Sequence, residues 1–167
     1  MLYRATLAGI ASARKRLTSR RWAGIARAMT QRVPQQLSDF AGTWALQRRI
    51  EDRKQGQVLL GQGQAVLQWQ GAQLIYDEEL VLELPGGPIS GTRRYLWQAR
   101  GRGIDVLFAD GRFFHHITLG AGASADTHHC DPDLYRGSYG FSDWPVWTAC
   151  WQVSGPRKDY VMQSTFS

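Results

Sequence analysis

From residue 40 to the C-terminus, hydrophobic and polar positions alternate with a period of two. Such alternation is typical of β-strands with one buried face, and no segment of this part keeps a helical period. Gly, Pro and Asp turn signals separate the alternating runs. The pattern predicts eight or nine strands, which lie within residues 44–50, 58–69, 74–84, 95–97, 104–108, 113–119, 134–141, 147–153 and 160–166.

The connections between these runs are rich in turn-forming residues. Residues 85–88 (PGGP) predict a turn, and residues 110–111 (DG) are a strong signal for a hairpin. Residues 120–127 (GAGASADT) are predicted as a flexible loop, while Gly61 and Gly63 indicate a bulge or a sharp bend in the second strand. Closing such a sheet on itself removes its exposed edges. We therefore predict an all-β fold, an antiparallel up-and-down barrel of eight or nine strands.

Positive charge is concentrated at the start of the chain. Residues 1–38 hold eight of the 20 Lys and Arg and none of the 14 Asp and Glu, so the 12 basic residues that follow leave the rest at −2. The length of 167 residues suits one domain, which usually has about 100–200 residues. We predict a basic, helix-permissive extension at residues 1–37 and a barrel domain at residues 38–167.

Three interpretations of the basic extension stay open. It can be an upstream piece of reading frame ahead of a true start at Met29, an organelle transit segment in a eukaryotic source, or a basic helix that binds a surface. Its apolar stretches are shorter than the core of a signal peptide, which has about 7–15 residues. Pro34 is expected to end any helix that forms there.

Composition excludes several classes of function. No apolar run reaches the roughly 18 residues of a transmembrane helix, so no membrane span is expected. A nucleic-acid partner is not expected either, because the body of the chain lacks excess positive charge. Cys130 and Cys150 are too few for a disulfide framework and are expected to be reduced thiols of a cytoplasmic protein, or of an organelle if the source is eukaryotic. The oligomeric state stays open.

Gly42-Thr43-Trp44 opens the first predicted strand. A Gly-x-Trp opening followed by a meander of strands resembles the calycin group, the lipocalins and their relatives. In that group the Trp plugs one end of the barrel and packs against a basic side chain of the last strand. The resemblance implies that Trp44 and Arg157, with Lys158 next to it, close the barrel here.

Longer motifs resemble one family in particular. They are residues 93–97 (RRYLW), 110–115 (DGRFFH), 129–135 (HCDPDLY), 141–145 (FSDWP) and 151–160 (WQVSGPRKDY). Together they are similar to domain-of-unknown-function family 6314, a bacterial and fungal family of calycin-like barrels. The resemblance covers residues 38–165. It implies a fold, no settled activity and no catalytic residue.

Basic and phenolic side chains near the C-terminus predict an anion site. Lys158 and Tyr160 are two positions apart, so on a strand they face the same side. Fatty-acid-binding relatives hold a carboxylate with such a pair, although with Arg in place of Lys, and a Lys acts only as a point charge. Arg94 is a further candidate for the same cavity. The alternative is that Lys158 lies over Trp44 and closes the barrel.

The histidines and Cys130 form a second set of candidates. Residues 115–116 and 128–130 hold all four His of the chain and one Cys, but neighbouring residues on a strand point to opposite faces. His128 and Cys130 can therefore converge, with His129 pointing away. The spacing matches no standard zinc motif, so no metal ligands are assigned and the cofactor stays open. His115 or His129 remains a candidate haem ligand.

Aromatic side chains complete the predicted pocket, since ligand sites are mostly apolar with a few polar groups. The main hypothesis is a barrel that binds one small hydrophobic or aromatic ligand, with an anionic group on that ligand held by basic or phenolic side chains. The alternatives are an enzyme that uses His115, His129 and Tyr135 for acid–base chemistry, a haem- or metal-binding barrel, and a filled barrel without a cavity. The candidate ligand-binding residues are Arg94, Trp97, His115, His129, Tyr135, Trp147, Trp151, Lys158 and Tyr160.

Overall fold

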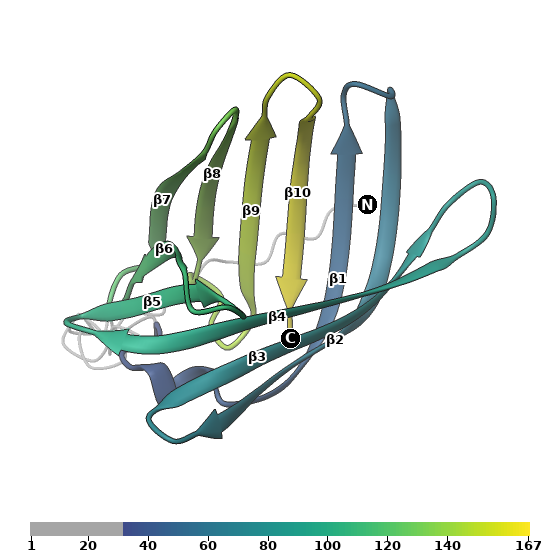
Figure 1. Ribbon diagram of the computed structural model, residues 1–167. Helices are drawn as coiled ribbons and strands as arrows, with labels where there is room; N and C mark the ends of the chain where they lie inside the picture. Colours follow the sequence, from purple (N-terminus) through teal and green to yellow (C-terminus); the bar gives the residue numbers. More distant parts are fainter. Residues whose placement is uncertain (1–31) are drawn as a thin grey trace, which may run out of the picture. The chain divides into compact units, whose positions relative to one another are not determined.

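The computed structural model describes residues 32–167, which form ten antiparallel strands and one short 3₁₀ helix (Figure 1). The predicted all-β antiparallel barrel is confirmed, but the number of strands is ten and not eight or nine. The elements are η1 (Leu37–Phe40), β1 (Gly42–Asp52), β2 (Gln57–Gln70), β3 (Gln73–Glu83), β4 (Ile89–Arg100), β5 (Gly103–Phe108), β6 (Phe113–Thr118), β7 (Ala123–Cys130), β8 (Asp133–Gly140), β9 (Trp147–Ser154) and β10 (Asp159–Phe166).

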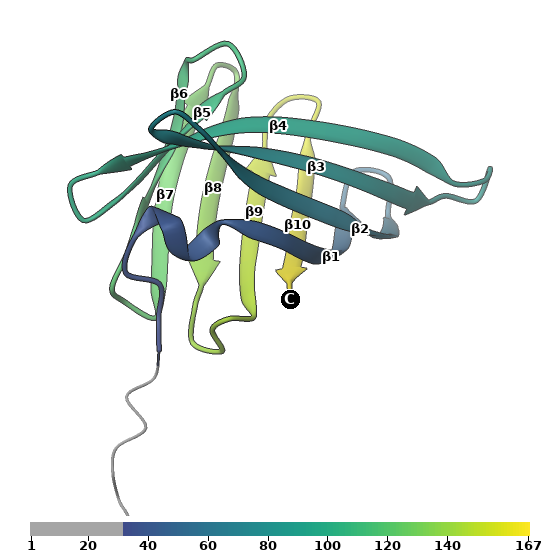
Figure 2. The same cartoon turned by 90° about the horizontal axis from the view of Figure 1, so that it is seen from below.

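The strands form one continuous sheet in the order β6-β5-β4-β3-β2-β1-β10-β9-β8-β7. Strand β1 closes the meander because it pairs with β2 on one side and with β10 on the other. The two ends of the sheet, β6 and β7, lie side by side in Figures 1 and 2 without a backbone ladder between them. The barrel is therefore nearly closed, with one seam.

Strand β7 is the element that the sequence pattern missed. Residues 120–127 were predicted as a loop, but Ala123–Cys130 pair along their whole length with β8. This segment is rich in small and polar residues, which have low strand propensity. It becomes a strand because its partner β8 begins only two residues after β7 ends, which leaves the two strands directly opposed.

Side chains of β7 bridge the seam to β6. The backbone N–H of His116 donates to a carboxylate oxygen of Asp126 at 2.7 Å, and the N–H of Thr118 donates to the hydroxyl of Ser124 at 2.8 Å. The side chains of β7 thus bind backbone N–H groups of β6 that would otherwise be unpaired at the edge of the sheet. These N–H groups are therefore not available to pair with a strand of another chain.

Gly61 and Gly63 produce a bend and not a bulge. The pairing of β2 with both β1 and β3 runs without a shift in register. Figure 1 shows β2 curving from the direction of β1 into that of β3. A Cβ atom at Gly63 would collide with the backbone carbonyl of Glu79, so the close approach of the two strands requires glycine there.

A bulge between β5 and β6 changes which residues face the interior. The register shifts between Val106 and Leu107, so that Val106 pairs with His115 and Leu107 with Phe113. Phe114 and His115 are then both buried although they are neighbours. Simple alternation would have placed only one of them inside.

Aromatic side chains fill one end of the barrel. Phe40, at the end of η1, is fully buried and packs edge-on against Trp97, Trp144 and Trp147 with centroid distances of 5.1–5.6 Å. Trp44 donates from its indole nitrogen to the carbonyl of Phe40 at 2.9 Å. Figure 2 shows η1 lying across this end, which we call the closed end.

The expected contact between Trp44 and Arg157 does not form. Trp44 is near the start of β1, where the antiparallel pairing brings it beside the last residues of β10. Arg157 is exposed in the turn before β10 begins, at the opposite end of the barrel. Trp44 is covered by Trp144 and Trp147 instead, at centroid distances of 5.6 and 5.9 Å.

Three further expectations concern the N-terminal extension, membrane-spanning helices and the two cysteines. The predicted helical character of residues 1–37 falls largely on residues 1–31, which lie outside the described residues. Between residues 32 and 167 no helix has the length and apolar character needed to cross a bilayer. Cys130 and Cys150 are both free thiols.

Candidate functional site

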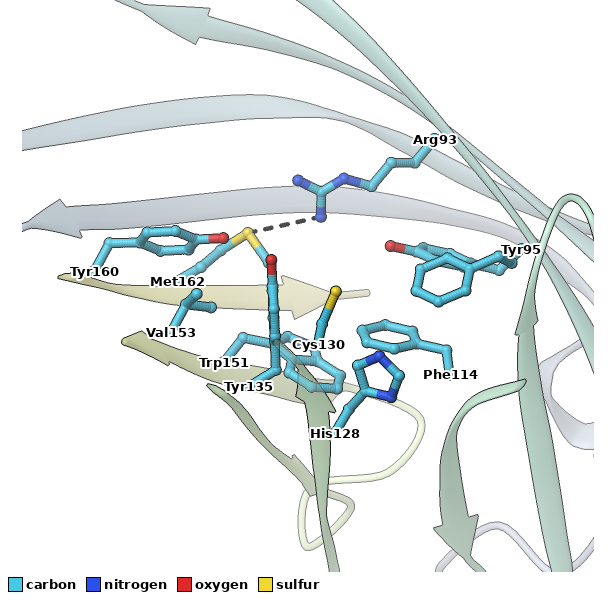
Figure 3. A pocket seen from close by; sticks show the side chains of 11 residues that line it. Arg93, Tyr95, Phe114, His128, Cys130, Tyr135, Trp151, Val153, Tyr160 and Met162 are labelled. Carbon is cyan, nitrogen blue, oxygen red and sulfur yellow. Dashed lines mark hydrogen bonds between the residues drawn. The ribbon is translucent and has the colours of Figure 1, made fainter. Parts of the chain in front are cut away.

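The end of the barrel opposite η1 is hollow. A pocket of about 270 Å³ opens there between the last residues of β5, β7 and β9 and the first residues of β6, β8 and β10, with β4 alongside (Figure 3). We call it the outer pocket. Its lining consists of Arg93, Tyr95, Phe108, Phe114, His128, Cys130, Tyr135, Trp151, Val153, Tyr160 and Met162.

The wall of the outer pocket is a stack of aromatic rings. Phe114 lies nearly parallel to Trp151, with 4.9 Å between centroids, and to Phe108, with 4.7 Å. The ring of Trp151 lies against β8 because Gly137 has no side chain, and a Cβ there would come within 2.5 Å of the ring. This geometry supplies flat apolar surface for an aromatic ligand.

Arg93 supplies the positive charge of the outer pocket. In Figure 3 its side chain reaches across the opening, and its Nη1 atom lies 3.8 Å from the sulfur of Met162. Among the described residues no carboxylate lies within ion-pair distance of Arg93. A guanidinium without a carboxylate partner is available to bind an anion.

Three phenol groups accompany Arg93 at the opening. Figure 3 shows the hydroxyls of Tyr95, Tyr135 and Tyr160 directed toward the cavity. Burial raises the pKa of Tyr95 and of Tyr160, while the charge of Arg93 acts in the opposite direction on both. These two hydroxyls therefore stay protonated at neutral pH and can donate hydrogen bonds to a ligand.

Lys158 lies at the edge of this opening, but it already has an anionic partner. Its ammonium group donates to the hydroxyl of Tyr135 at 2.8 Å and forms an ion pair with Asp133 at 2.6 Å. The hydrogen bond to Asp133, followed by that to Tyr135, raises the pKa of Lys158. It belongs to the turn before β10 and not to the strand. Lys158 therefore fixes the hydroxyl of Tyr135 more than it offers free charge.

The histidines are divided between different faces of the sheet. His128 and Cys130 line the outer pocket, and His129 between them is exposed on the other face. His115 is buried deeper in the barrel, and His116 pairs with Asp105 at 2.7 Å near the seam. His115, His129 and Tyr135 therefore do not meet in one site, and the acid–base alternative has no shared geometry. The described residues contain no group of three or more His, Cys, Asp or Glu that could hold a metal ion.

A layer of buried polar residues lies below the outer pocket. Arg48 forms a bidentate pair with Glu78, with distances of 2.5 and 2.7 Å, and Glu78 also accepts a hydrogen bond from Tyr76 at 2.6 Å. Burial acts to raise the pKa of Glu78, but the hydrogen bonds and charge of Arg48 outweigh it and the pKa is lowered. Ser164 accepts a further bond from Arg48 at 2.9 Å. The pair is charged, buried and saturated with partners.

His115 belongs to the same layer. Its Nε2 atom lies 2.8 Å from the hydroxyl of Tyr139, and burial lowers the pKa of His115 to about 3. Burial raises the pKa of Tyr139 strongly, so its phenol stays protonated. His115 is therefore neutral at physiological pH.

The other predicted site residues lie away from the opening. Trp97 and Trp147 belong to the closed end, where both contact Phe40. Arg94 is exposed on the outer face of β4 and pairs with Asp77 at 2.6 Å, so it does not line the outer pocket. Tyr135, Trp151 and Tyr160 are the predicted residues that do line it.

Several pocket residues were not among the candidate ligand-binding residues, and alternation along a strand is the signal that could have found one of them. Arg93 shares its parity with Tyr95 and Trp97, so alternation along β4 already places Arg93 inside and Arg94 outside. The same rule predicted that His128 and Cys130 share one face, and both line the pocket. No pattern in the sequence signals Phe114, because the bulge that turns it inward is a property of the pairing with β5.

Comparisons with known proteins agree with this architecture. A family model described as "Family of unknown function (DUF6314)" matches residues 40–167. Among solved structures, an S-type phycobiliprotein lyase, CPES, from Guillardia theta is similar, with a TM-score of 0.55 and 10% sequence identity over 78% of this chain and 87% of that one. At this identity the likeness concerns the fold alone. None of the curated proteins matches the sequence.

Proposed function

The chain belongs to the Family of unknown function (DUF6314), and from the geometry of its barrel we propose that it binds one small aromatic anion in the outer pocket. The observation that carries this proposal is Arg93, a guanidinium without a carboxylate partner that reaches across a pocket walled by stacked rings. The rings take the flat apolar part of the ligand. Arg93 and the hydroxyls of Tyr95 and Tyr160 take its acidic group.

The size of the outer pocket limits the ligand. Pockets for drug-sized molecules have volumes of about 300–1,000 Å³, and this one has about 270 Å³. A molecule of two or three rings fits this volume. A larger one would extend beyond the opening into solvent.

The similar solved barrel adds one specific candidate. That protein is a phycobiliprotein lyase, which favours a bilin among the aromatic acids worth testing on this chain. A bilin combines conjugated pyrrole rings with propionate groups, so it has the two features that the outer pocket favours. Its length exceeds the pocket, so on this chain only part of it would be enclosed.

The test compares two neighbouring arginines. Anilinonaphthalene sulfonate, a fluorescent aromatic anion, is titrated into the full chain and into the variants Arg93→Met and Arg94→Met, with biliverdin as a second probe. The two variants remove the same charge from adjacent positions of β4, one inside and one outside. We expect Arg93→Met to weaken binding about 10- to 100-fold, the effect of a lost charge-assisted bond, and Arg94→Met to leave it unchanged.

Either of two results would refute the proposal. Equal weakening by both variants would show that the probe responds to net charge and not to the pocket. Absence of saturable binding of both probes to the unmodified chain would show that the outer pocket does not accept aromatic anions.

A further inference from the structure

A second, smaller cavity lies deeper in the barrel than the outer pocket. It has a volume of about 40 Å³ and is enclosed between the buried polar layer and the aromatic residues of the closed end. We call it the inner void. The residues that line both cavities and so stand between them are Arg93, Tyr95, Phe114, Trp151 and Met162.

Three buried nitrogen atoms around the inner void have no hydrogen-bond partner. They are Nε1 of Trp97, Nε1 of Trp147 and Nδ1 of His115, and all three side chains line the void. Trp97, Trp147 and His115 are only 2, 1 and 2% exposed. A buried polar group without a partner costs about 1–3 kcal/mol, and three such groups among the side chains that line one void favour an occupant that accepts hydrogen bonds.

All three nitrogen atoms are donors. An indole nitrogen only donates. The hydroxyl of Tyr139 lies 2.8 Å from Nε2 of His115 and stays protonated because burial raises its pKa, and we take this hydroxyl as the donor to Nε2. We therefore assign the hydrogen of the neutral imidazole to Nδ1.

The void has room for an occupant larger than one water, since a water needs only about 10–15 Å³ of such space. A water oxygen accepts two hydrogen bonds and leaves the third donor without a partner. The charged side chains that line the void are Arg48, Arg93 and Glu78, which give the lining one net positive charge. Three N–H donors and a net positive charge match a monovalent anion better than a neutral molecule.

We infer that the inner void binds one small monovalent anion of the size of chloride or bromide, held by the indole N–H groups of Trp97 and Trp147 and by Nδ1–H of His115. The residues that separate the two cavities keep the acidic end of a bulky ligand out of this site. Arg93 lines both cavities, so the charge argument shares this one residue with the proposed function. The three N–H donors belong to the inner void alone, and the inference stands if the outer pocket proves empty.

Bromide is the probe, because it can be located by anomalous diffraction. Crystals of the full chain grown in sodium bromide are expected to show an anomalous peak within hydrogen-bond distance of both indole nitrogens. In solution, the unfolding temperature is expected to be higher in sodium bromide than in sodium methanesulfonate at equal ionic strength. This difference should saturate as the bromide concentration rises. At ten times the dissociation constant the increase should be about 5 °C for a domain of this size.

Variants that keep an aromatic side chain but remove the indole N–H group identify the donors. Trp97→Phe and Trp147→Phe should each abolish or weaken the saturable effect of bromide at least tenfold. Trp69→Phe, at an indole that is 52% exposed, is the matched control and should keep it. If one of the two core variants fails to fold, the other still provides the test.

The inference is wrong if bromide and methanesulfonate give the same unfolding temperatures at all concentrations. It is also wrong if the diffraction map shows only a water in the void, or if Trp97→Phe and Trp147→Phe respond to bromide as the unmodified chain does.

Discussion

The two ends of this barrel are both rich in aromatic side chains, yet one is packed and the other is hollow. At the closed end Phe40 enters from η1 and contacts Trp97, Trp144 and Trp147, and Phe166 stacks on Trp147 with 3.7 Å between centroids. At the open end no helix of residues 32–167 crosses the opening, and the rings line a cavity of about 270 Å³. Aromatic content alone therefore does not predict a pocket, because what decides is whether a further segment fills the space between the rings.

The polar groups differ between the two regions as well. In the buried layer Arg48 and Glu78 neutralise each other, and each has further hydrogen bonds. At the opening Arg93 has no carboxylate partner within the described residues. A satisfied ion pair fixes the fold, whereas an unpaired cation at an opening is available for a ligand.

The largest expected effect comes from removing the aromatic ring that fills the closed end. Phe40→Ala removes a fully buried ring that four aromatic neighbours surround, and it should lower the free energy of unfolding by about 3–5 kcal/mol. Urea unfolding measures the change. Phe113→Ala is the control, because Phe113 is 52% exposed and its loss should matter far less. Similar losses for the two variants would show that η1 does not act as a plug.

A second test breaks the buried ion pair. Glu78→Gln leaves Arg48 as an uncompensated buried charge and should lower the free energy of unfolding by about 3 kcal/mol. This value is at the lower end for such changes because the amide oxygen still accepts one hydrogen bond. Asp77→Asn, next to it, breaks the exposed pair with Arg94 and should cost at most about 1 kcal/mol. Equal costs in urea unfolding would mean that the inner pair is as solvated as the outer one.

The third and smallest effect is on the pH dependence of stability. The pKa of His115 is about 3 in the folded protein and 6.5 ordinarily, so the unfolded chain takes up the proton first as the pH falls. The stabilisation associated with neutral His115 is therefore complete above pH 6.5 and is lost as the pH falls toward 3. Between pH 6.5 and 4.5 the free energy of unfolding should fall by about 2–3 kcal/mol. The lowered pKa of Glu78 acts below its ordinary 4.5, so the two effects overlap there and the range between pH 6.5 and 4.5 reports on His115.

Two substitutions isolate the effect of His115. His115→Gln removes the titrating ring and should flatten the stability curve between pH 4.5 and 6.5. His129→Gln, at an exposed position, should leave the curve unchanged. A curve for His115→Gln with the slope of the unmodified chain would assign the pH dependence to other groups.

Much of this architecture follows from the alternation of residues along the chain. The period of two, the turn signals and the antiparallel meander all predict the barrel, and they place Trp151, Tyr135 and Tyr160 on its inner face. Applied consistently, the same rule selects Arg93 over Arg94. These features are local, since the geometry of a strand alone sets which side chains share a face.

The remaining features depend on contacts between distant parts of the chain. Strand β7 has little strand propensity of its own and exists because β8 pairs with it and β6 lies beside it. The bulge that turns Phe114 inward belongs to the pairing of β5 and β6, and antiparallel pairing separates Arg157 from Trp44. The sequence by itself determined which residues can face the interior. Only the tertiary structure decided which end is filled, because η1 covers one opening and nothing among the described residues covers the other.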